Sequence, residues 1–495
     1  MSDDKSRYGA VNTTLGPSDS ESITSEPSVK HKAPWWSYIW DYDPNRTHVE
    51  RKFLQKLDLS LLTILSLGYF IKNLDQTNIS NAYVSGMKED LQMNANEINL
   101  IDIAWTTGYV VGQLPSQLIL TKVRPSIWIP SCELVWTILT FCLAAASTSK
   151  HVIVIRFFVG LVESIFYPAA HFLIGSWYKP NELGKRAGLF HASSAAAGMF
   201  SGYLQAAVYK GLNGTGGKAG WQWLFIMDGI ISAPICLAGF FLIPDLPENT
   251  RAFYLTKDDA GLARERMDDV GRAPRKKLGW SILKRVFTRW HVWALTILYI
   301  IFINIGPSSS ISPLALWLKA NKWPITKINV IPTGQSAVQL VCTVGFAILS
   351  DFLRNRPIFF GFLSNLFLAI WNVPKGLKWF SYFAARIAVP YGPLSMSWAN
   401  EICGNDAEER ALVLGIMNAA GYAFHTWLPL LTYPAKQAPR FKRGFIFSTC
   451  AFVAQFGITG LVWWLQRWEG RRKKEKGRES ERESLGGGGG EGDGH

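Results

Sequence analysis

The stretch "KLDLSLLTILSLGYFIKNLDQTNISNA", residues 56–82, decides the fold of this chain. Its first half consists mainly of Leu, Ile and aromatic residues, which is the composition of a helix that crosses a membrane. Several polar and ionisable residues follow, with no Pro or Gly among them to end the helix: Lys72, Asn73, Asp75, Gln76, Asn78 and Asn81. Two interpretations are open at this point. The helix either leaves the bilayer here, or it carries ionisable groups into the bilayer for a function.

The composition of the whole chain favours a membrane protein with polar ends. Hydrophobic residues make up 48% of the 495 residues and are concentrated in dense apolar blocks. The net charge is +14, and the basic residues gather in the N-terminal segment, a central loop and the "RRKKEKGR" stretch near the C-terminus. These positions flank the apolar blocks, as the positive-inside rule predicts for cytosolic segments. Membrane topology therefore accounts for the charge better than nucleic-acid binding does.

Apolar segments close to the ~20 residues that a membrane-spanning helix needs occur along the whole chain. We predict twelve spans, near 56–76, 98–121, 127–147, 152–174, 187–209, 222–243, 291–318, 325–350, 357–373, 377–399, 411–433 and 444–467. An even number places both termini on one side, and the basic segments make that side cytosolic. Residues 1–52 contain no short apolar core with a cleavage site, so we expect the first span to direct insertion. The expected location is the plasma membrane.

The spans form two pseudo-symmetric six-helix bundles, so the predicted fold is an all-α integral membrane protein. The expected parts are a disordered cytosolic tail, a six-helix bundle, a charged cytosolic loop, a second six-helix bundle and a disordered cytosolic tail, at residues 1–52, 53–243, 244–290, 291–467 and 468–495. The halves echo each other, because "GQLPSQLILTKVRPS" follows the second span and "GFAILSDFLRNRPIF" follows the eighth. Parallel halves are typical of secondary transporters with a binding site between the halves.

Other chemistries have little support in the sequence. "GLNGTGGKAG" at 211–220 resembles a phosphate loop, but Leu212 and Ala219 stand where the Walker spacing needs Gly and Ser or Thr. No nucleophile elbow, HExxH motif or paired-carboxylate loop stands out, so we expect no enzyme activity, no metal and no cofactor. The expected partners are a small organic anion, a proton and the lipid bilayer, without nucleic acid, and the expected state is a monomer.

Ionisable residues in the first and fourth spans are the main site candidates. Arg156 and Glu163 are seven residues apart, so both face one side of the fourth span. The planar cation of Arg156 suits a substrate carboxylate, and Glu163 in an apolar setting could take up a proton. In the first span Lys72 and Asp75 can pair on a face that continues to Asn78. The alternatives are a structural Arg–Glu contact and an Asp that only neutralises its Lys.

The second half offers further polar candidates for contacts to a substrate. In the seventh span "NIGPSSSISP" interrupts the helix and frees backbone groups for a site or a hinge. The tenth span has an Arg before another stretch that contains Pro and Gly. The candidates from these and two other spans are Asn304, Ser308, Gln335, Arg386 and Asn418. Hydrogen bonds between helices are an equally good account of such residues.

At this point the chain resembles the major facilitator superfamily over about residues 50–470. Within it, the sequence is similar to the fungal allantoate-permease branch of the anion:cation symporters, and most of all to its pantothenate-type transporters. The resemblance is carried by several stretches together: "LDQTNISNA", "PSQLILTKVRPS", "RFFVGLVESIFYPA", "SWYKPNELGKRA", "GWQWLFIMDG", "PDLPENTRAF", "SWANE" and "NAAGYAFHTWLPLL". It implies the major facilitator fold of twelve transmembrane helices.

The resemblance also implies roles for particular residues. In that family a transmembrane Arg and Glu of the fourth helix serve anion binding and proton coupling, and they correspond to Arg156 and Glu163. The first-helix signature Asp-Arg-x-Asn is matched by Asp75 and Asn78, but Gln76 stands at the Arg position. The second cation of the family's anion site is therefore missing from its usual place, and Lys72, one turn away, is a candidate substitute.

From these observations we expect a proton-coupled symporter for a small organic monocarboxylate such as pantothenate, working by alternating access. Glu163 and Asp75 are the expected proton-coupling residues. The loss of the Arg at Gln76 agrees with a singly charged substrate. The alternatives are an exporter of a fungal metabolite, an importer of allantoate, biotin, nicotinate or a sulfur compound, and, more remotely, a nutrient sensor that does not transport.

Overall fold

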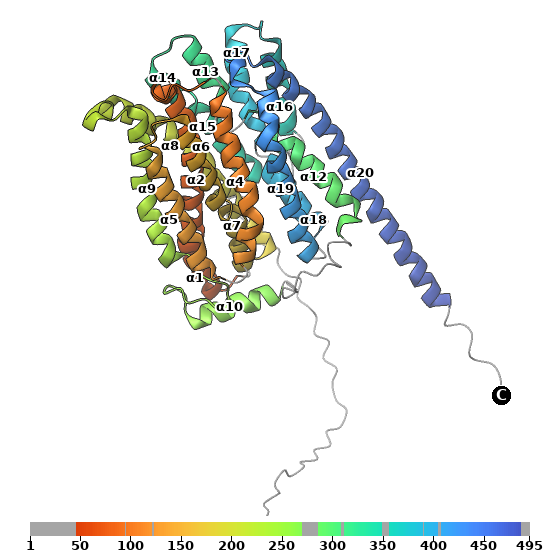
Figure 1. Ribbon diagram of the computed structural model, residues 1–495. Coiled ribbons are helices and arrows are strands. Elements are labelled where there is room, and N and C mark those ends of the chain that lie inside the picture. The colour runs from red at the N-terminus through yellow and green to blue at the C-terminus, as the bar shows by residue number, and fades with distance from the viewer. Residues whose placement is uncertain are drawn as a thin grey trace, which may run out of the picture. The chain divides into compact units, whose positions relative to one another are not determined.

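A computed structural model describes residues 46–94, 96–120, 123–269, 286–307, 311–348, 356–389, 391–403 and 407–486 (Figure 1). All regular secondary structure in these ranges is helical, as the sequence predicts. Three predicted parts lie outside the described residues: the tail before residue 46, residues 270–285 of the central loop and the Gly-rich end from residue 487.

The first half of the chain supplies the helices that hold most of the predicted site. In order, they are α1 (His48–Leu57), the π-helical turn η2 (Asp58–Leu62), α2 (Thr63–Ala82), η3 (Tyr83–Met87), α3 (Lys88–Asp90), α4 (Glu97–Leu120), α5 (Pro125–Leu143), α6 (Ser149–Glu163), α7 (Phe166–Trp177), α8 (Pro180–Leu212), η4 (Thr215–Gly217) and α9 (Gly220–Leu242). A separate helix, α10 (Lys257–Asp268), follows in the charged central segment.

The helices of the second half are more often interrupted. They are α12 (Trp290–Ile303), α13 (Pro313–Ala320), α14 (Ile325–Val330), α15 (Thr333–Ile348), α16 (Arg356–Ile370), α17 (Lys375–Ala384), η5 (Ala385–Ala388), α18 (Tyr391–Ile402), α19 (Ala407–Thr432), η6 (Ala435–Gln437) and α20 (Lys442–Gly486). The predicted break in the seventh span separates α12 from α13. It contains Gly306 with a φ of 140°, a conformation that favours Gly, and α13 starts at Pro313.

Each predicted span coincides with a helix or a broken helix of the described chain. By length and composition alone, five continuous helical stretches in the described ranges could cross a membrane: His48–Asp90, Pro125–Leu143, Ser149–Trp177, Gly220–Leu242 and Lys442–Arg472. Trp290–Ile303 and Gly361–Ile370 are apolar but shorter. These helices support a membrane protein, while the criterion by itself does not fix the number of spans.

The prediction of a disordered tail from residue 468 is wrong for residues 468–486. There α20 continues without a break past the end of the predicted span, to Gly486 (Figure 1). The sequence after Trp468 is rich in Arg, Lys and Glu, which are good helix formers and can pair along one helix face. A high charge content is therefore compatible with a helix that grows from a stable span.

Close packing between helices depends on Gly at a few positions in the first half. A Cβ added at Gly160 of α6 would lie 2.0 Å from the carbonyl oxygen of Trp105 in α4, and one at Gly108 would lie 2.0 Å from that of Phe157. These two glycines let the backbones of α4 and α6 touch, as small residues do in membrane bundles. The contact holds Trp105 of α4 beside the ionisable face of α6.

Within the described residues, the largest apolar cluster shared by the two halves of the chain lies at one end. One apolar cluster combines residues of both halves, among them Tyr83 and Trp221 with Leu314 and Tyr433. Across the same end Asn329 donates a hydrogen bond to Ser85 over 2.9 Å. At the other end the described apolar residues form two separate clusters, one within residues 53–263 and one within 286–462. The chain is therefore closed at the end that holds α13 and α14.

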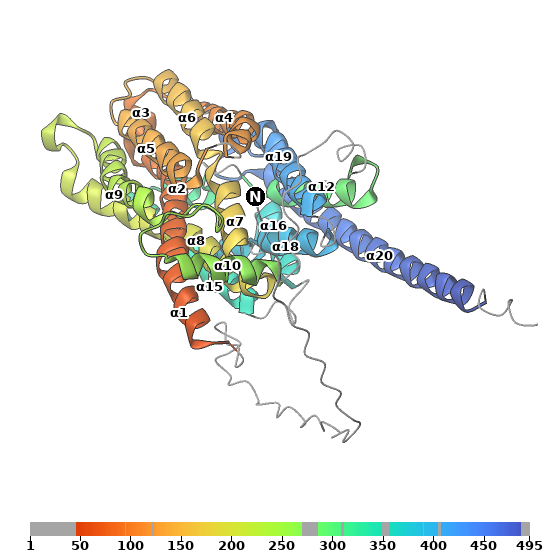
Figure 2. The same cartoon turned by 90° about the horizontal axis from the view of Figure 1, so that it is seen from below.

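At the opposite end, α10 lies close to α1 and α8 (Figure 2), and ion pairs fix it to the first half. Arg266 of α10 binds Glu50 of α1 and Glu182 of α8, and all three side chains are largely shielded from solvent. Lys56 lies 2.6 Å from Asp259 of α10. Burial by itself would raise the pKa of Asp259, but hydrogen bonds from Lys56 and Thr256 lower that pKa below its usual value. The helix α10 therefore belongs structurally to the first half.

The glycine contact between α4 and α6 makes a testable prediction. The change Gly160→Ala should force the two helices apart and destabilise the protein by ~1–3 kcal/mol, the usual cost of overpacking. The same change at Gly457 of α20, where an added Cβ meets no described atom within 4 Å, is the matched control and should be neutral or stabilising. The measurement is the midpoint of thermal unfolding in one detergent. Equal midpoints for the two variants would contradict the close contact.

Candidate functional site

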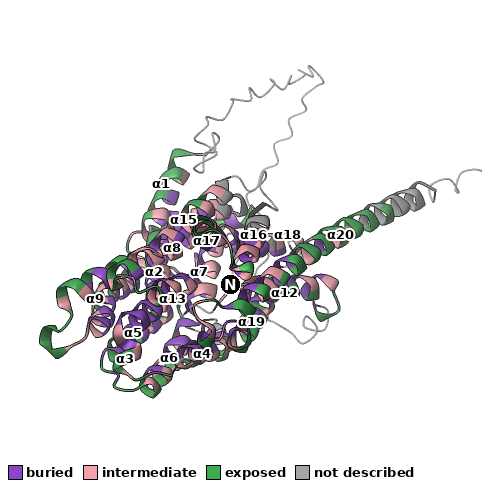
Figure 3. Cartoon of the chain, turned by 90° about the horizontal axis from the view of Figure 1, so that it is seen from above, coloured by how far each residue is buried: buried purple, intermediate pink, exposed green. Residues whose placement is uncertain are grey.

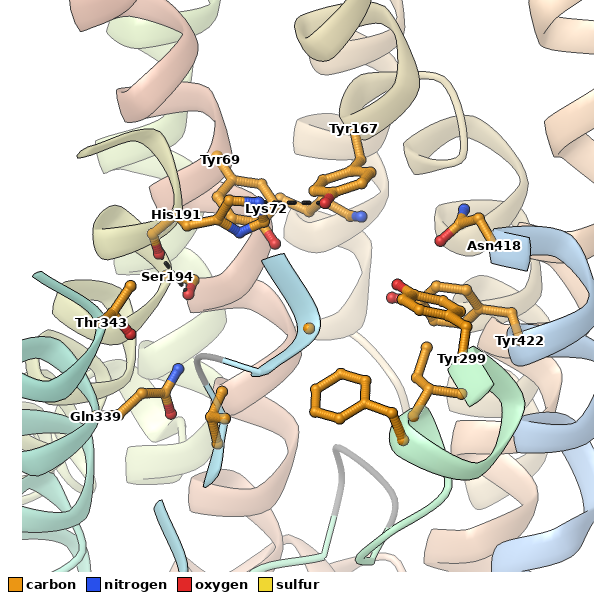
Figure 4. Close-up of a pocket in the computed structure, with 14 residues that line it drawn as sticks. Tyr69, Lys72, Tyr167, His191, Ser194, Tyr299, Gln339, Thr343, Asn418 and Tyr422 are labelled. Carbon is orange, nitrogen blue, oxygen red and sulfur yellow. Dashed lines mark hydrogen bonds between the residues drawn. The ribbon is translucent and has the colours of Figure 1, made fainter. Parts of the chain in front are cut away.

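A cavity of about 240 Å³ lies between the two halves of the described chain (Figure 4). The first half contributes Tyr69 and Lys72 from α2, Tyr167 from α7, and His191 and Ser194 from α8. The second half contributes residues of α12, α15, α18 and α19 and the residue after η5, among them Tyr299, Gln339, Thr343, Asn418 and Tyr422. A ligand in this cavity would contact both halves, as the predicted binding mode requires.

Lys72 is the one lysine or arginine among the described residues that line the cavity. Its ammonium group lies 3.3 Å from the hydroxyl of Tyr109 and 4.4 Å from the centre of that ring. The ring of Trp105 lies 6.0 Å away. No ion pair to Lys72 occurs within the described ranges, although the side chain is buried. The predicted pair with Asp75 is therefore not formed, and aromatic rings hold the cation instead.

Arg156 is paired with Asp75. Its guanidinium donates to the Asp75 carboxylate over 3.1 Å, and both side chains are almost completely buried. The Arg156 guanidinium also lies 5.8 Å from the ring of Trp105. It does not line the cavity. The structure thus brings Arg156 and Asp75 together across α6 and α2, while the predicted substrate contact of Arg156 stays a prediction.

Glu163 sits at the end of α6 and is fully buried. One of its carboxylate oxygens accepts a hydrogen bond from the indole of Trp105 over 2.9 Å and a long one from Gln76 over 3.4 Å. The other oxygen, Oε1, has no hydrogen-bond partner among the described residues. A buried carboxyl with one unused oxygen is well placed to carry a proton.

Asp228 of α9 is a buried carboxyl that our sequence analysis did not single out. Asn78 donates to it over 2.7 Å, and Asn78 in turn accepts a hydrogen bond from Ser201 of α8. The Asp228 oxygen Oδ1 has no partner in the described part of the chain. The sequence could have indicated Asp228, because an ionisable residue inside an apolar span is a candidate for a functional site. The same signal marks Glu133 of α5, whose oxygen Oε2 is likewise unpartnered among described residues.

The predicted contacts in the second half fall into different places. Asn418 lines the cavity, whereas the amide of Gln335 donates to the backbone carbonyl of Tyr382 over 2.6 Å. Asn304 donates to the carbonyl of Gly421, which joins α12 to α19. These two amides hold helices together, as the alternative interpretation stated. Arg386 is half-buried in η5 and does not line the cavity, and Ser308 lies outside the described residues.

Aromatic side chains form much of the cavity wall, and the sequence did not identify them. Tyr69 stacks on Phe190 with ring centres 4.5 Å apart, and Tyr422 packs against Tyr109 at 4.8 Å. Tyr167 shares a hydrogen bond with His191 (Figure 4). Aromatic residues are common in every span of this chain, so composition alone does not indicate which of them face a ligand. The wall suits the hydrocarbon part of a small amphipathic molecule.

Five of the buried ionisable groups in the described part of the first half interact with one another beside the cavity. Lys72 and Arg156 are the cations, and the carboxyls are Asp75, Glu163 and Asp228. If all five were ionised, the group would carry one excess negative charge in a low-dielectric interior, which is costly. At least one of these carboxyls is thus expected to hold a proton. This charge imbalance is the chemical property that distinguishes the site.

Comparison with known proteins identifies the class to which the chain belongs. The model of the Major Facilitator Superfamily matches residues 65–425. The chain belongs to this superfamily, a class of membrane transport proteins, and the predicted fold class is confirmed.

The chain is similar to two curated fungal transporters over most of its length. It is 38% identical to the pantothenate transporter liz1 of Schizosaccharomyces pombe over 410 residues, which cover 80% of this chain and 79% of that protein. It is 35% identical to the pantothenate transporter FEN2 of Saccharomyces cerevisiae over 431 residues, which cover 83% of each. These matches confirm the resemblance to the pantothenate-type branch.

A solved structure with the same fold is the proton:xylose symporter XylE bound to 6-bromo-6-deoxy-D-glucose. The TM-score is 0.64, the sequence identity is 14%, and the match covers 81% of this chain and 94% of that chain. This likeness establishes the fold, independently of any shared substrate.

The buried pair between Arg156 and Asp75 makes a prediction about stability. Asp75→Asn leaves an Arg cation buried without its partner, and it should destabilise the protein by ~3–5 kcal/mol. Arg156→Gln should cost less, because the carboxyl that remains can be neutralised by a proton while an Arg cannot. The double variant should recover part of the loss. The measurement is thermal unfolding of the purified variants, and equal losses for the two single variants would contradict this assignment.

Proposed function

We propose that this protein is a secondary transporter that imports a small organic monocarboxylate, such as pantothenate, together with a proton. Two kinds of observation support the proposal. Two relatives, 38% and 35% identical over 80% and 83% of this chain, are named pantothenate transporters. The cavity between the halves presents one cation and an aromatic wall to a ligand, and a group of buried carboxyls lies beside it.

The observation that carries the proposal is the position of Lys72. Its ammonium group lines the cavity and has no carboxylate partner within ion-pair distance among the described residues, so a substrate carboxylate can bind to it. Arg156, by contrast, is occupied by Asp75. Lys72 thus supplies the positive charge that is missing at Gln76, and a single accessible cation suits a substrate with a single negative charge.

Charge balance supplies the link to a proton. The empty site is neutral when two of its three carboxyls are ionised against the two cations. A bound monocarboxylate adds one negative charge, and one further proton restores neutrality. A neutral loaded site lowers the cost of moving charges through the low-dielectric interior while the protein reorients. One proton should therefore accompany each substrate molecule.

Glu163 is the best candidate for the carboxyl that exchanges this proton. Lys72 and Arg156 both act on it electrostatically, and its oxygen Oε1 has no hydrogen-bond partner among the described residues, so it can take up a proton. Asp228 accepts a hydrogen bond from Asn78 and has no ion-pair partner within the described residues, so it faces no cation that a substrate could compete for. Asp75 is occupied by its ion pair with Arg156. Substrate at Lys72 would remove the electrostatic support of ionised Glu163.

Alternating access follows from how the halves meet. The structure is closed at the end with α13 and α14, and the clusters at the end with α10 are separate. We assign the closed end to the outer face and the α10 end to the cytosol, with both termini cytosolic and the protein in the plasma membrane. The conformation would then be the one that releases substrate inward.

Uptake in a host that lacks its own carriers tests this function. Labelled pantothenate should accumulate, and biotin, nicotinate and allantoate serve as competing substrates. Lys72→Gln should raise the KM for the monocarboxylate by roughly 10- to 100-fold, because it removes a charge-assisted hydrogen bond worth ~1.5–3 kcal/mol. Lys72→Arg is the matched control and should retain most of the affinity. Accumulation of none of the four compounds would reject import, and an unchanged KM for Lys72→Gln would reject the role of Lys72.

A second variant pair tests the proton site in proteoliposomes. Glu163→Gln should abolish accumulation driven by a pH gradient while substrate exchange at equal concentrations continues, because a permanently neutral side chain cannot carry the proton. Asp228→Asn is the control and should still couple uptake to the gradient. If Glu163→Gln keeps its response to the gradient, Glu163 does not carry the proton.

A further inference from the structure

Exposed Trp and Arg side chains form a surface at the end of the second half where α12 begins and α20 leaves the bundle. We name it the α12–α20 platform, and its residues are Trp293, Trp463, Arg467, Trp468, Arg471 and Arg472. The least exposed of the three Trp residues is still 40% exposed. Figure 3 shows α20 as a helix with a largely exposed outer face. No part of this platform belongs to the cavity.

The platform contains two pairs in which an Arg guanidinium lies on a Trp ring. The guanidinium of Arg467 lies 3.8 Å from the ring centre of Trp463, and that of Arg472 lies 4.0 Å from the ring centre of Trp468. Each pair places a planar cation on an aromatic face, and the N–H groups of a guanidinium lie at the edge of its plane, where they can bind an acceptor. The two pairs are five residues apart, so they lie about 140° from each other around the axis of α20, both on its exposed side.

The carboxylate of the nearby Glu469 does not pair with these cations but binds to α12. Glu469 of α20 accepts a hydrogen bond from the indole of Trp290 in α12 over 2.9 Å, which also joins the two helices. The exposed face of α20 is therefore dominated by cations at this level. In sequence, residues 467–478 contain seven basic and two acidic residues: Arg467, Arg471, Arg472, Lys473, Lys474, Lys476 and Arg478 against Glu469 and Glu475.

The position of the platform points to the membrane surface. Lys442–Arg472 is one of the stretches apolar enough to cross a membrane, and the platform lies at its end. Exposed Trp residues at the end of a span sit at the depth of the lipid headgroups. Basic residues directly beyond a span attract anionic lipids of the adjacent leaflet. Two helix ends that were merely solvated would have no need for three exposed Trp residues, one on α12 and two on α20.

We propose that the α12–α20 platform binds the headgroups of anionic phospholipids. The Arg pairs would hold the phosphate oxygens through charge-assisted hydrogen bonds, and the Trp rings would pack on the glycerol and upper acyl region. Such binding fixes the end of α20 at the membrane surface. Since α20 packs on α12 and α16, the lipid would also anchor the second half while the first half moves.

Native mass spectrometry of the full-length protein tests this binding. The protein is placed in nanodiscs of phosphatidylcholine and phosphatidylserine in equal amounts, and the lipids that remain bound are identified. The wild type should retain phosphatidylserine in preference to phosphatidylcholine. The triple variant Arg467→Gln, Arg471→Gln, Arg472→Gln should lose this preference by roughly tenfold or more, because each cation near an anionic surface contributes to the attraction.

Three controls make the outcome unambiguous. Gln at Arg440, Lys442 and Arg443, exposed cations at the other end of α20, should leave the preference unchanged. A triple Lys variant at the platform, Arg467→Lys, Arg471→Lys, Arg472→Lys, should keep most of it. Equal thermal midpoints in phosphatidylcholine alone establish that the Gln variant is folded. An absent preference in the wild type, an equal loss in both Gln variants, or displacement of the lipid by inorganic phosphate would overturn the proposal.

Discussion

The ion pair between Arg156 and Asp75 is the interaction on which the organisation of the site depends. Arg cannot release its proton, so a buried Arg in a membrane bundle needs a fixed negative partner. Asp75 fills that role and ties α2 to α6. Because it does so, Lys72 on the same helix has no ion-pair partner among the described residues, and its ammonium group contacts Tyr109 at the edge of the cavity. One structural pair thereby creates one accessible cation.

The rest of the architecture places this cation where a transporter needs it. Glycines bring α4 against α6, which sets Trp105 between Arg156 and Glu163. The second half closes over the cavity with Tyr299, Tyr422 and Asn418, so a ligand on Lys72 touches both bundles. The halves meet at the end with α13 and α14, and α10 stays with the first half through Arg266. The cation, the aromatic wall of the cavity and the closed end of the protein are thus built by different helices. A rigid-body movement of one half against the other would move them together.

The sequence predicted the fold and part of the site, for identifiable reasons. Apolar length revealed the spans, and the cost of ionisable groups in lipid singled out Lys72, Asp75, Arg156 and Glu163. That rule also covers Asp228 and Glu133, which we overlooked. The rule does not say which of these groups form ion pairs. Spacing along single helices favoured Lys72 with Asp75 and Arg156 with Glu163. Packing between helices instead joins Arg156 to Asp75. The sequence also does not distinguish an amide that binds the backbone of another helix, as Gln335 does, from an amide that lines a cavity.

In the proposed mechanism, one proton on Glu163 balances the charge of one monocarboxylate bound to Lys72. The most direct test is uptake of labelled monocarboxylate into proteoliposomes, with the pH gradient and the membrane potential set independently. We expect electroneutral transport, with one proton entering per substrate molecule. The initial rate of uptake should therefore rise with an inward proton gradient and should not change with the membrane potential. A rate that increases with an inside-negative potential, or that ignores the proton gradient, would contradict it.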